Sequence, residues 1–199
     1  MSVKRPIILG SASPRRHEIL LNAGIAHTIV TAEADEKSIR FTPGHAGEYV
    51  LSIAALKNAA VVESIKDRDN ESLVISADTI VYFPDNDVVL GKPKDPDDAT
   101  KMLRMLSGKS HEVLTGVVIH DMKTGCEERF YEATKVFFRE LSVEEISEYV
   151  SSGDPLDKAG SYGMQSGACA FVRRIDGDYF NVVGLPVCRV SEIIQRIGI

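Results

Sequence analysis

Residues 6–17 read PIILGSASPRRH, and this stretch decides the fold that we expect. Its first four residues, PIIL, predict a short buried strand. Ser13 and Pro14 suit the N-cap and the first position of a helix, and Gly24 suits its end, so we expect a helix over residues 14–22. A strand that leads through a turn of small residues into a helix is typical of α/β proteins.

The start of this predicted helix carries the wrong charge. Arg15, Arg16 and His17 lie where the unpaired N–H groups and the positive end of the helix dipole favour Asp and Glu. An anion held between backbone amides and guanidinium groups would offset the misfit, and phosphate is the commonest such anion. The alternative is an ordinary helix whose arginines are solvated, and this stretch alone leaves both interpretations open.

The composition indicates a folded domain with a sizeable core. The chain has 199 residues, of which 44% are hydrophobic and 26% charged, so we expect a single domain over residues 1–199. The formal net charge of −6 argues against a nucleic-acid polymer as partner, because such binders usually carry a broad basic surface. A small anionic ligand in a local basic pocket is compatible with this charge.

The spacing of the cysteines and the length of the apolar stretches bear on where in the cell the protein is expected. Cys126, Cys169 and Cys188 are widely spaced, which predicts reduced thiols and no zinc site. We find neither a secretory signal nor an apolar stretch of membrane-spanning length. We therefore expect a cytoplasmic protein without a membrane partner.

Strands and helices mix along the whole chain, which predicts an α/β fold of mixed α+β character with one central sheet. Ser142 and Glu145 form a capping box. Residues 151–167 show no periodic pattern, and a loop of this length is either a surface loop or part of a site. The expected strands are 6–9, 28–31, 73–77, 80–83, 88–90, 113–119, 130–138 and a pair around Asp176 and Gly177; the expected helices are 14–22, a long one opened by Thr42 and Pro43, one from Asp95 to Gly108, 142–150 and 186–197.

Two acidic side chains are candidates for chemistry. Asp78 follows the predicted strand 73–77, and ligands of α/β sheets bind where strands end. A lone Asp there would more often be a turn or cap residue, and Glu36 also fits a solvated loop. Two carboxylates near a phosphate chain suit a divalent metal such as magnesium.

Three lysines are candidates for binding an anion. Lys57 lies on the apolar face of the predicted long helix, where it either snorkels to solvent or reaches into a site. Lys92 and Lys158 lie in predicted loops, where a lysine is usually a plain surface residue. Residues 108–110 (GKS) imitate the end of a phosphate-binding P-loop, but Leu103 stands where the first glycine is required. We therefore reject a P-loop kinase or ATPase.

Five ordered motifs resemble those of the Maf family of nucleotide pyrophosphatases. The resemblance spans nearly the whole chain, and the VGLP at residues 183–186 fits it too. Gly10 and Ser161 stand where alanine is frequent in the family, and Asp154 stands where glutamate is frequent. The motifs are LGSASPRR at 9–16, ADT at 77–79, GKP at 91–93, LSGKxHxVxTG at 106–116 and DKAGxYGxQ at 157–165.

The resemblance implies hydrolysis of a nucleoside triphosphate between its α and β phosphates, which gives a monophosphate and pyrophosphate. It also implies a divalent cation (Mg²⁺ or Mn²⁺), a homodimer, and a two-lobed fold similar to inosine triphosphate pyrophosphatases, with a central mixed sheet flanked by helices. By resemblance, Asp78 accepts a proton from water or binds metal, Glu36 is the second acidic ligand, and Lys92 joins them in catalysis. The implied substrate-binding positions are Ser11, Arg15, Arg16, Lys57, Thr79, Lys158 and Gln165.

The motifs PRR, ADT and KAGxYGxQ are similar to the branch of the family that acts on dTTP and UTP. The amide of Gln165 can donate to a pyrimidine oxygen and accept from N3–H, which a glutamate does less well. Arg15 and Thr79 also fall on base-selecting positions, and modified pyrimidine triphosphates are further candidate substrates. The alternative is a nucleotide-binding regulator of cell division with little or no hydrolysis, which requires the same pocket.

Overall fold

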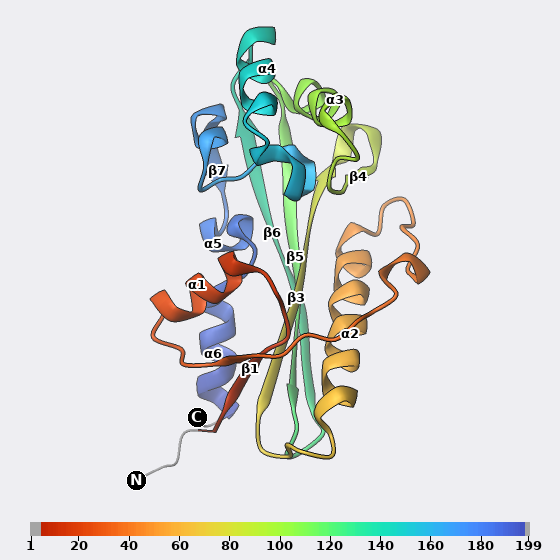
Figure 1. The fold of residues 1–199 in the computed structure, drawn as a ribbon, viewed down its shortest axis with the longest axis vertical. Helices are drawn as coiled ribbons and strands as arrows, with labels where there is room; N and C mark the ends of the chain where they lie inside the picture. The colour runs from red at the N-terminus through yellow and green to blue at the C-terminus, as the bar shows by residue number, and fades with distance from the viewer. Residues whose placement is uncertain (1–4, 198–199) are drawn as a thin grey trace. The chain divides into compact units, whose positions relative to one another are not determined.

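The computed structural model describes residues 5–197, which fall into two compact units. Unit 1 consists of residues 5–78, 115–132 and 184–197, and unit 2 consists of residues 79–114 and 133–183. The strands (Figure 1) are β1 (Ile7–Leu9), β2 (Thr28–Ile29), β3 (Leu73–Phe83), β4 (Val88–Leu90), β5 (Ser110–Asp121), β6 (Glu127–Phe138) and β7 (Val172–Asp176). The helices are α1 (Pro14–Asn22), α2 (Ala46–Ile65), α3 (Pro96–Leu106), α4 (Val143–Ser151), α5 (Tyr179–Val183) and α6 (Val187–Ile197).

The strands form a mixed sheet of seven strands. Its order is β2-β1-β3-β5-β6-β7, and β4 pairs with β3 outside this path. β1 runs parallel to both β2 and β3, whereas β4 is antiparallel to β3 and β7 is antiparallel to β6. The mixed α/β class that the sequence predicts is therefore confirmed.

In unit 1, α2 and α6 lie on opposite sides of the strands (Figure 1). Helix α2 presents Val61 and Ile65, which pack against Ile8 of β1 and Val74 of β3 in a small buried cluster. These two residues lie one turn apart, on the same face of the helix. Apolar packing therefore holds α2 against the parallel strands.

Gly116 of β5 permits an unusually close approach of α2. A Cβ atom at this position would lie 2.7 Å from the carbonyl oxygen of Val50 and 2.8 Å from the Cα of Leu51. Both of these are backbone atoms of α2, which cannot move aside as a flexible side chain could. The glycine is therefore what allows the helix backbone to lie directly on the strand.

Unit 2 has an apolar core of its own. Leu103 and Leu106 of α3, Ile146 of α4 and Phe138 of β6 are all buried in one cluster, and α3 packs against α4. Helix α4 begins with the predicted capping box at Ser142, whose hydroxyl accepts the backbone N–H of the glutamate three residues on. Helix α3 has Asp95 as its N-cap, whose side chain accepts the backbone N–H of Asp98. Helices α3 and α4 therefore start where their caps predict.

The prediction for the start of α2 is wrong by four residues. The helix begins at Ala46, not at Thr42 and Pro43. Gly44 adopts a φ of +79°, and the carbonyl oxygen of Thr42 accepts the N–H of His45, so the chain makes a turn before the helix. A threonine–proline pair therefore opens this turn, and the helix starts only after the glycine.

Two further expectations are also wrong. Strand β3 continues through Asp78 to Phe83 as one strand, where we expected a break. Near Asp176, β7 pairs with β6, and the residues after Gly177 form α5 instead of a second strand. The side chain of Asp178 accepts the N–H of Phe180 at 2.7 Å, so this aspartate supports the start of a short helix.

Two findings concern the helices and the cysteines of the described residues. Among residues 5–197, no helix is both long and apolar enough to cross a membrane. Cys126, Cys169 and Cys188 are free and exposed.

Candidate functional site

The first turn of α1 has the composition that the sequence predicts. The Ser13 hydroxyl accepts the backbone N–H of Arg16 at 3.5 Å, Pro14 opens the helix, and no acidic residue lies in the first turn. Arg16 is buried, with 9% of its surface exposed. Its Nε donates to the carbonyl oxygen of Gly184 at 2.8 Å, and its Nη1 donates to the hydroxyl of Ser11 at 3.0 Å. The solvated-arginine interpretation is therefore excluded for Arg16.

The charges around Arg16 explain how this guanidinium is tolerated. Burial lowers the pKa of Arg16, and the positive charge of Arg15 lowers it further. The negative charges of Asp78 and Glu36 act in the opposite direction and raise its pKa. Arg16 therefore lies within the electrostatic field of both predicted carboxylates, all within unit 1.

Lys57 joins the two carboxylates. Its Nζ lies 2.6 Å from Asp78 Oδ1 and 3.1 Å from Glu36 Oε1. The side chains of Lys57 and Asp78 are 23% and 15% exposed, whereas that of Glu36 is 51% exposed. Lys57 therefore does not snorkel to solvent. From its place on α2 it contacts one acidic group on strand β3 and one in the short 3-10 turn Glu36–Ser38.

Asp78 lies within β3, and this ion pair gives its carboxylate a partner. Aspartate is disfavoured in strands, and a turn after residue 77 would have been the ordinary outcome. Here the carboxylate receives the ammonium of Lys57, which lies 21 residues earlier on α2. Both partners of this contact lie on regular elements, Asp78 on β3 and Lys57 on α2, so the direction of the carboxylate is well defined.

The two carboxylates fit one way of binding a hard cation. Magnesium is commonly held by one or two carboxylates together with substrate phosphates and water. Asp78 and Glu36 both reach the same ammonium, so their oxygens converge on one cation. Within residues 5–197 there is no group of three or more His, Cys, Asp or Glu side chains arranged to hold a metal. These two carboxylates therefore fit a cation that takes its remaining ligands from a substrate and from water.

Tyr49 is a residue of this region that the sequence analysis missed. Burial raises the pKa of Tyr49, and the charges of Asp78 and Glu36 raise it further, so the phenol lies in the same electrostatic field as Arg16. Its ring meets that of Phe41 edge to face, with centroids 5.5 Å apart. The sequence signal was its spacing of eight residues before Lys57 on a helix, which keeps both on one side of α2.

The other predicted residues belong to unit 2. Thr79 follows Asp78 in β3 and is half-buried, Lys92 is exposed in the loop after β4, and Gln165 is exposed in the segment after η4 (Ala159–Ser161). Lys158 is better held: its Nζ donates to Asp157 Oδ1 at 2.7 Å and to Asp154 Oδ1 at 3.0 Å. Within unit 2, the described contacts thus tie Lys158 to acidic neighbours.

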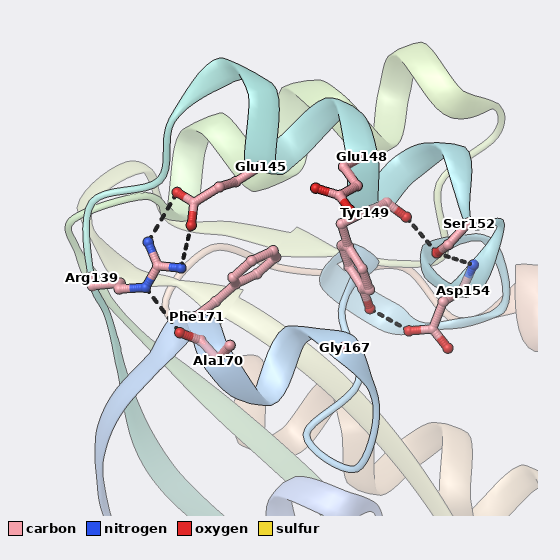
Figure 2. A pocket seen from close by; sticks show the side chains of 9 residues that line it. All are labelled: Arg139, Glu145, Glu148, Tyr149, Ser152, Asp154, Gly167, Ala170 and Phe171. Atoms are coloured by element: carbon pink, nitrogen blue, oxygen red, sulfur yellow. Dashed lines mark hydrogen bonds and ion pairs between the residues drawn. The ribbon is translucent and has the colours of Figure 1, made fainter.

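A cavity of about 520 Å³ lies in unit 2 (Figure 2). On one wall, the Arg139 guanidinium pairs with Glu145 at 2.6 Å and holds the pKa of that carboxyl to about 2. On another wall, the Tyr149 hydroxyl donates to Asp154 at 2.5 Å. The lining consists of Arg139, Glu145, Glu148, Tyr149, Ser152, Asp154, Gly167, Ala170 and Phe171, and it includes none of the predicted site residues.

The structure thus brings the predicted site residues of unit 1 into contact with one another, in two sets. Ser11 contacts Arg16, and Lys57 joins Glu36 and Asp78, with Arg15 and Arg16 on the same helix. The carbonyl of Gly184 was missed as the partner of Arg16 because any residue type can supply a carbonyl. The Tyr149–Asp154 pair was also missed, although the spacing of Asp154 and Lys158 by four residues was a signal for their ion pair.

Comparisons with known sequences cover almost the whole chain. A family model described as Maf-like protein matches residues 6–197. A dTTP/UTP pyrophosphatase of Geobacillus sp. (strain WCH70) is 44% identical over 194 residues, which are 98% of this chain and 99% of that protein. A dTTP/UTP pyrophosphatase of Syntrophomonas wolfei is 46% identical over 190 residues, 96% of each chain. One of Bacillus cereus (strain B4264) is 45% identical over 98% of this chain and 97% of its own.

Comparisons with solved structures concern the fold. A HAM1 protein from Coxiella burnetii aligns with a TM-score of 0.53 at 10% identity, covering 96% of this chain and 99% of its own. The Ham1 protein of Staphylococcus aureus aligns with a TM-score of 0.50 at 12% identity, covering 97% and 100%. At such identities the likeness shows a shared fold.

Proposed function

The chain belongs to the Maf-like protein family, and from this premise we propose that it is a nucleoside triphosphate pyrophosphatase. Its single domain, residues 1–199, hydrolyses dTTP and UTP between the α and β phosphates and releases a monophosphate and pyrophosphate. Modified pyrimidine triphosphates belong to the same substrate class. Support comes from dTTP/UTP pyrophosphatases of 44 to 46% identity that match the chain over nearly its full length.

The observation that carries the proposal is the contact of Lys57 with both Asp78 and Glu36, 2.6 and 3.1 Å from its Nζ. Hydrolysis at phosphorus needs a group that takes a proton from water and positive charge that stabilises the phosphates. Asp78 is the proton acceptor, because its carboxylate is fixed on a strand and paired with the ammonium of Lys57. Lys57 and Arg16 are positive charges of unit 1. The family resemblance assigns Lys92 as a further catalytic residue.

We assign the divalent cation, Mg²⁺ or Mn²⁺, to the same two carboxylates. Asp78 and Glu36 would hold it together with phosphate oxygens of the substrate. When bound, such a cation polarises phosphate oxygens and offsets the negative charge that builds up on them. Glu36, which is half exposed, can turn toward a ligand more easily than Asp78 can.

The remaining assignments separate phosphate binding from base selection. Arg16 is buried and already oriented by Ser11 and Gly184, which suits a phosphate ligand. The exposed amide of Gln165 suits recognition of a pyrimidine edge, because it offers both a donor and an acceptor. The proposed substrate-binding residues are Ser11, Arg15, Arg16, Lys57, Thr79, Lys158 and Gln165.

The setting of the enzyme follows from the same proposal. Three exposed free cysteines suit a reducing compartment, so we place the enzyme in the cytoplasm. The family resemblance implies a homodimer, and sedimentation velocity measures whether the chain forms one.

Release of pyrophosphate from a panel of nucleotides tests the proposal. The panel contains dTTP, UTP, CTP and 7-methylguanosine triphosphate, each with and without Mg²⁺ or Mn²⁺. We expect turnover of dTTP and UTP that requires the cation, and much slower turnover of the other two. Binding of dTTP without release of pyrophosphate would contradict the proposal and favour a nucleotide-binding regulator instead.

A further inference from the structure

The segment of residues 158–166 has a backbone that it would not adopt unaided. Ser161 has a φ of +62° although it is not glycine, and Gly160 before it has a φ of +68°. A left-handed serine is strained and persists where surrounding contacts impose it. Lys158 and Gln165 lie on this segment, so the contacts that impose its shape also set where these two side chains stand.

A single pair of side chains supplies several of those contacts. Tyr149, on α4, donates its hydroxyl hydrogen to Asp154 Oδ2 at 2.5 Å (Figure 2). The same hydroxyl oxygen accepts the backbone N–H of Gly163 at 3.2 Å. Asp154 also accepts the hydroxyl of Ser166 at 2.6 Å and the ammonium of Lys158 at 3.0 Å. The start, the middle and the end of the segment are therefore all tied to the Tyr149–Asp154 pair.

The pair itself is firmly held. Tyr149 is 7% exposed, and its ring meets the ring of Phe171 edge to face, with centroids 5.2 Å apart. A Cβ atom on Gly167 would touch the ring at 3.4 Å. Burial and the bond to Asp154 raise the pKa of the Tyr149 hydroxyl, so it stays a donor. Burial opposes ionisation of Asp154, but hydrogen bonds from Ser166, Tyr149 and Lys158 lower its pKa, so it stays an acceptor.

From this geometry we infer that Tyr149 and Asp154 are positioning residues that set substrate affinity and base preference through Lys158 and Gln165. The inference rests on the proposed function, which assigns Lys158 and Gln165 to the substrate. Neither member of the pair needs to touch the nucleotide. Loosening the pair should therefore weaken substrate binding and blur the choice of base while leaving the chemical step nearly intact.

The test is Tyr149→Phe, which removes the hydroxyl and keeps the packed ring. Tyr82→Phe is the matched control, because Tyr82 makes a similar bond of 2.7 Å to Asp87 elsewhere in unit 2. We expect KM for dTTP to rise about tenfold in Tyr149→Phe, the effect of one or two lost hydrogen bonds. We expect kcat to change less than twofold, the preference for dTTP over CTP to fall several-fold, and Tyr82→Phe to match the wild type.

Ser166→Ala removes another of these ties and decides the question by the same criteria if Tyr149→Phe does not fold. An unchanged KM and base preference, or a fall in kcat at constant KM, would overturn the inference. Hydrogen exchange of a peptide that covers residues 158–166 provides a readout that does not depend on activity. Faster exchange in Tyr149→Phe than in Tyr82→Phe supports the inference, and equal exchange overturns it. A wild-type protein that hydrolyses no nucleotide overturns the proposed function instead.

Discussion

The two units hold their candidate site residues in different ways. In unit 1, Arg16, Lys57 and Asp78 lie on two helices and a strand, and charged contacts of 2.6 to 3.1 Å join them to their neighbours. In unit 2, Lys158 and Gln165 lie on a segment of short turns. The hydrogen bonds of buried tyrosines, Tyr149 and Tyr162, anchor that segment.

This difference matches the tasks that we propose for the two groups. Groups that carry out a reaction must keep their geometry closely, and regular elements provide that. Groups that choose a base can lie on a loop, whose shape changes without disturbing the strands beneath it. The chemistry should therefore fail when Asp78 is altered, and substrate choice should change when the segment of residues 158–166 is altered.

Asp78→Asn tests the unit 1 side of this comparison and should have the largest effect. The variant keeps the shape of the side chain but cannot accept a proton, so we expect kcat to fall about 10²- to 10⁴-fold. Lys57 retains Glu36 as a partner, so the fold should survive, as circular dichroism would show. Asp85→Asn, in the exposed turn before β4, is the matched control and should retain full activity. A folded Asp78→Asn protein with normal turnover would refute our assignment.

Gly116→Ala tests whether the frame of unit 1 depends on close packing of α2. The added methyl group would meet the backbone of Val50 and Leu51 at 2.7 to 2.8 Å, so we expect a loss of about 1–3 kcal/mol in the free energy of unfolding. Urea denaturation measures this loss. Gly91→Ala is the control, because no atom beyond its two chain neighbours lies within 4 Å of its added carbon. Equal stability of the two variants would show that α2 can move away from β5 at little cost in free energy.

A pH series tests the buried hydrogen bond between His111 and Tyr162 in unit 2, which joins two uncharged side chains. His111 is fully buried and shares a hydrogen bond of 2.7 Å with Tyr162, and burial lowers its pKa to about 3. In the unfolded chain the imidazole takes a proton near pH 6.5, so below that pH the unfolded state binds more protons and the protein loses stability. Between pH 7.5 and 5.0 we expect His111 to reduce the free energy of unfolding by about 1–2 kcal/mol.

His111→Gln supplies the comparison for this series. Glutamine is polar but does not titrate, so the dependence of unfolding free energy on pH should be shallower in the variant than in the wild type. Urea denaturation at each pH gives both curves. Parallel curves would mean that His111 does not titrate on unfolding in this range.

Much of the fold was predictable because local signals decide it. The caps at Ser13 and Ser142 mark helix starts that the structure confirms, and the charge misfit at Arg16 pointed to a residue that is indeed buried and bonded. The start of α2 was not predictable from propensity, since the positive φ of Gly44 appears only in the folded chain. Local sequence thus predicts where helices are, and less reliably where they begin.

The contacts of the candidate site were harder to predict because they are long-range. Asp78 looked like a strand end, but β3 continues through it to Phe83, and its carboxylate pairs with Lys57 on α2. The partner of Arg16 is a main-chain carbonyl 168 residues away, which leaves no mark in the residue type. Side-chain identity therefore indicated the chemistry, and the pairing of the side chains required the structure.

The contact of Arg16 with Gly184 and Ser11 also affects how an anion would bind. A free arginine gives up as much as about 2 kcal/mol of rotamer entropy when it is immobilised. Here folding has already met that cost, because the guanidinium is locked before any ligand arrives. A phosphate would thus find a preorganised receptor, and its affinity for Arg16 should come with little entropic penalty.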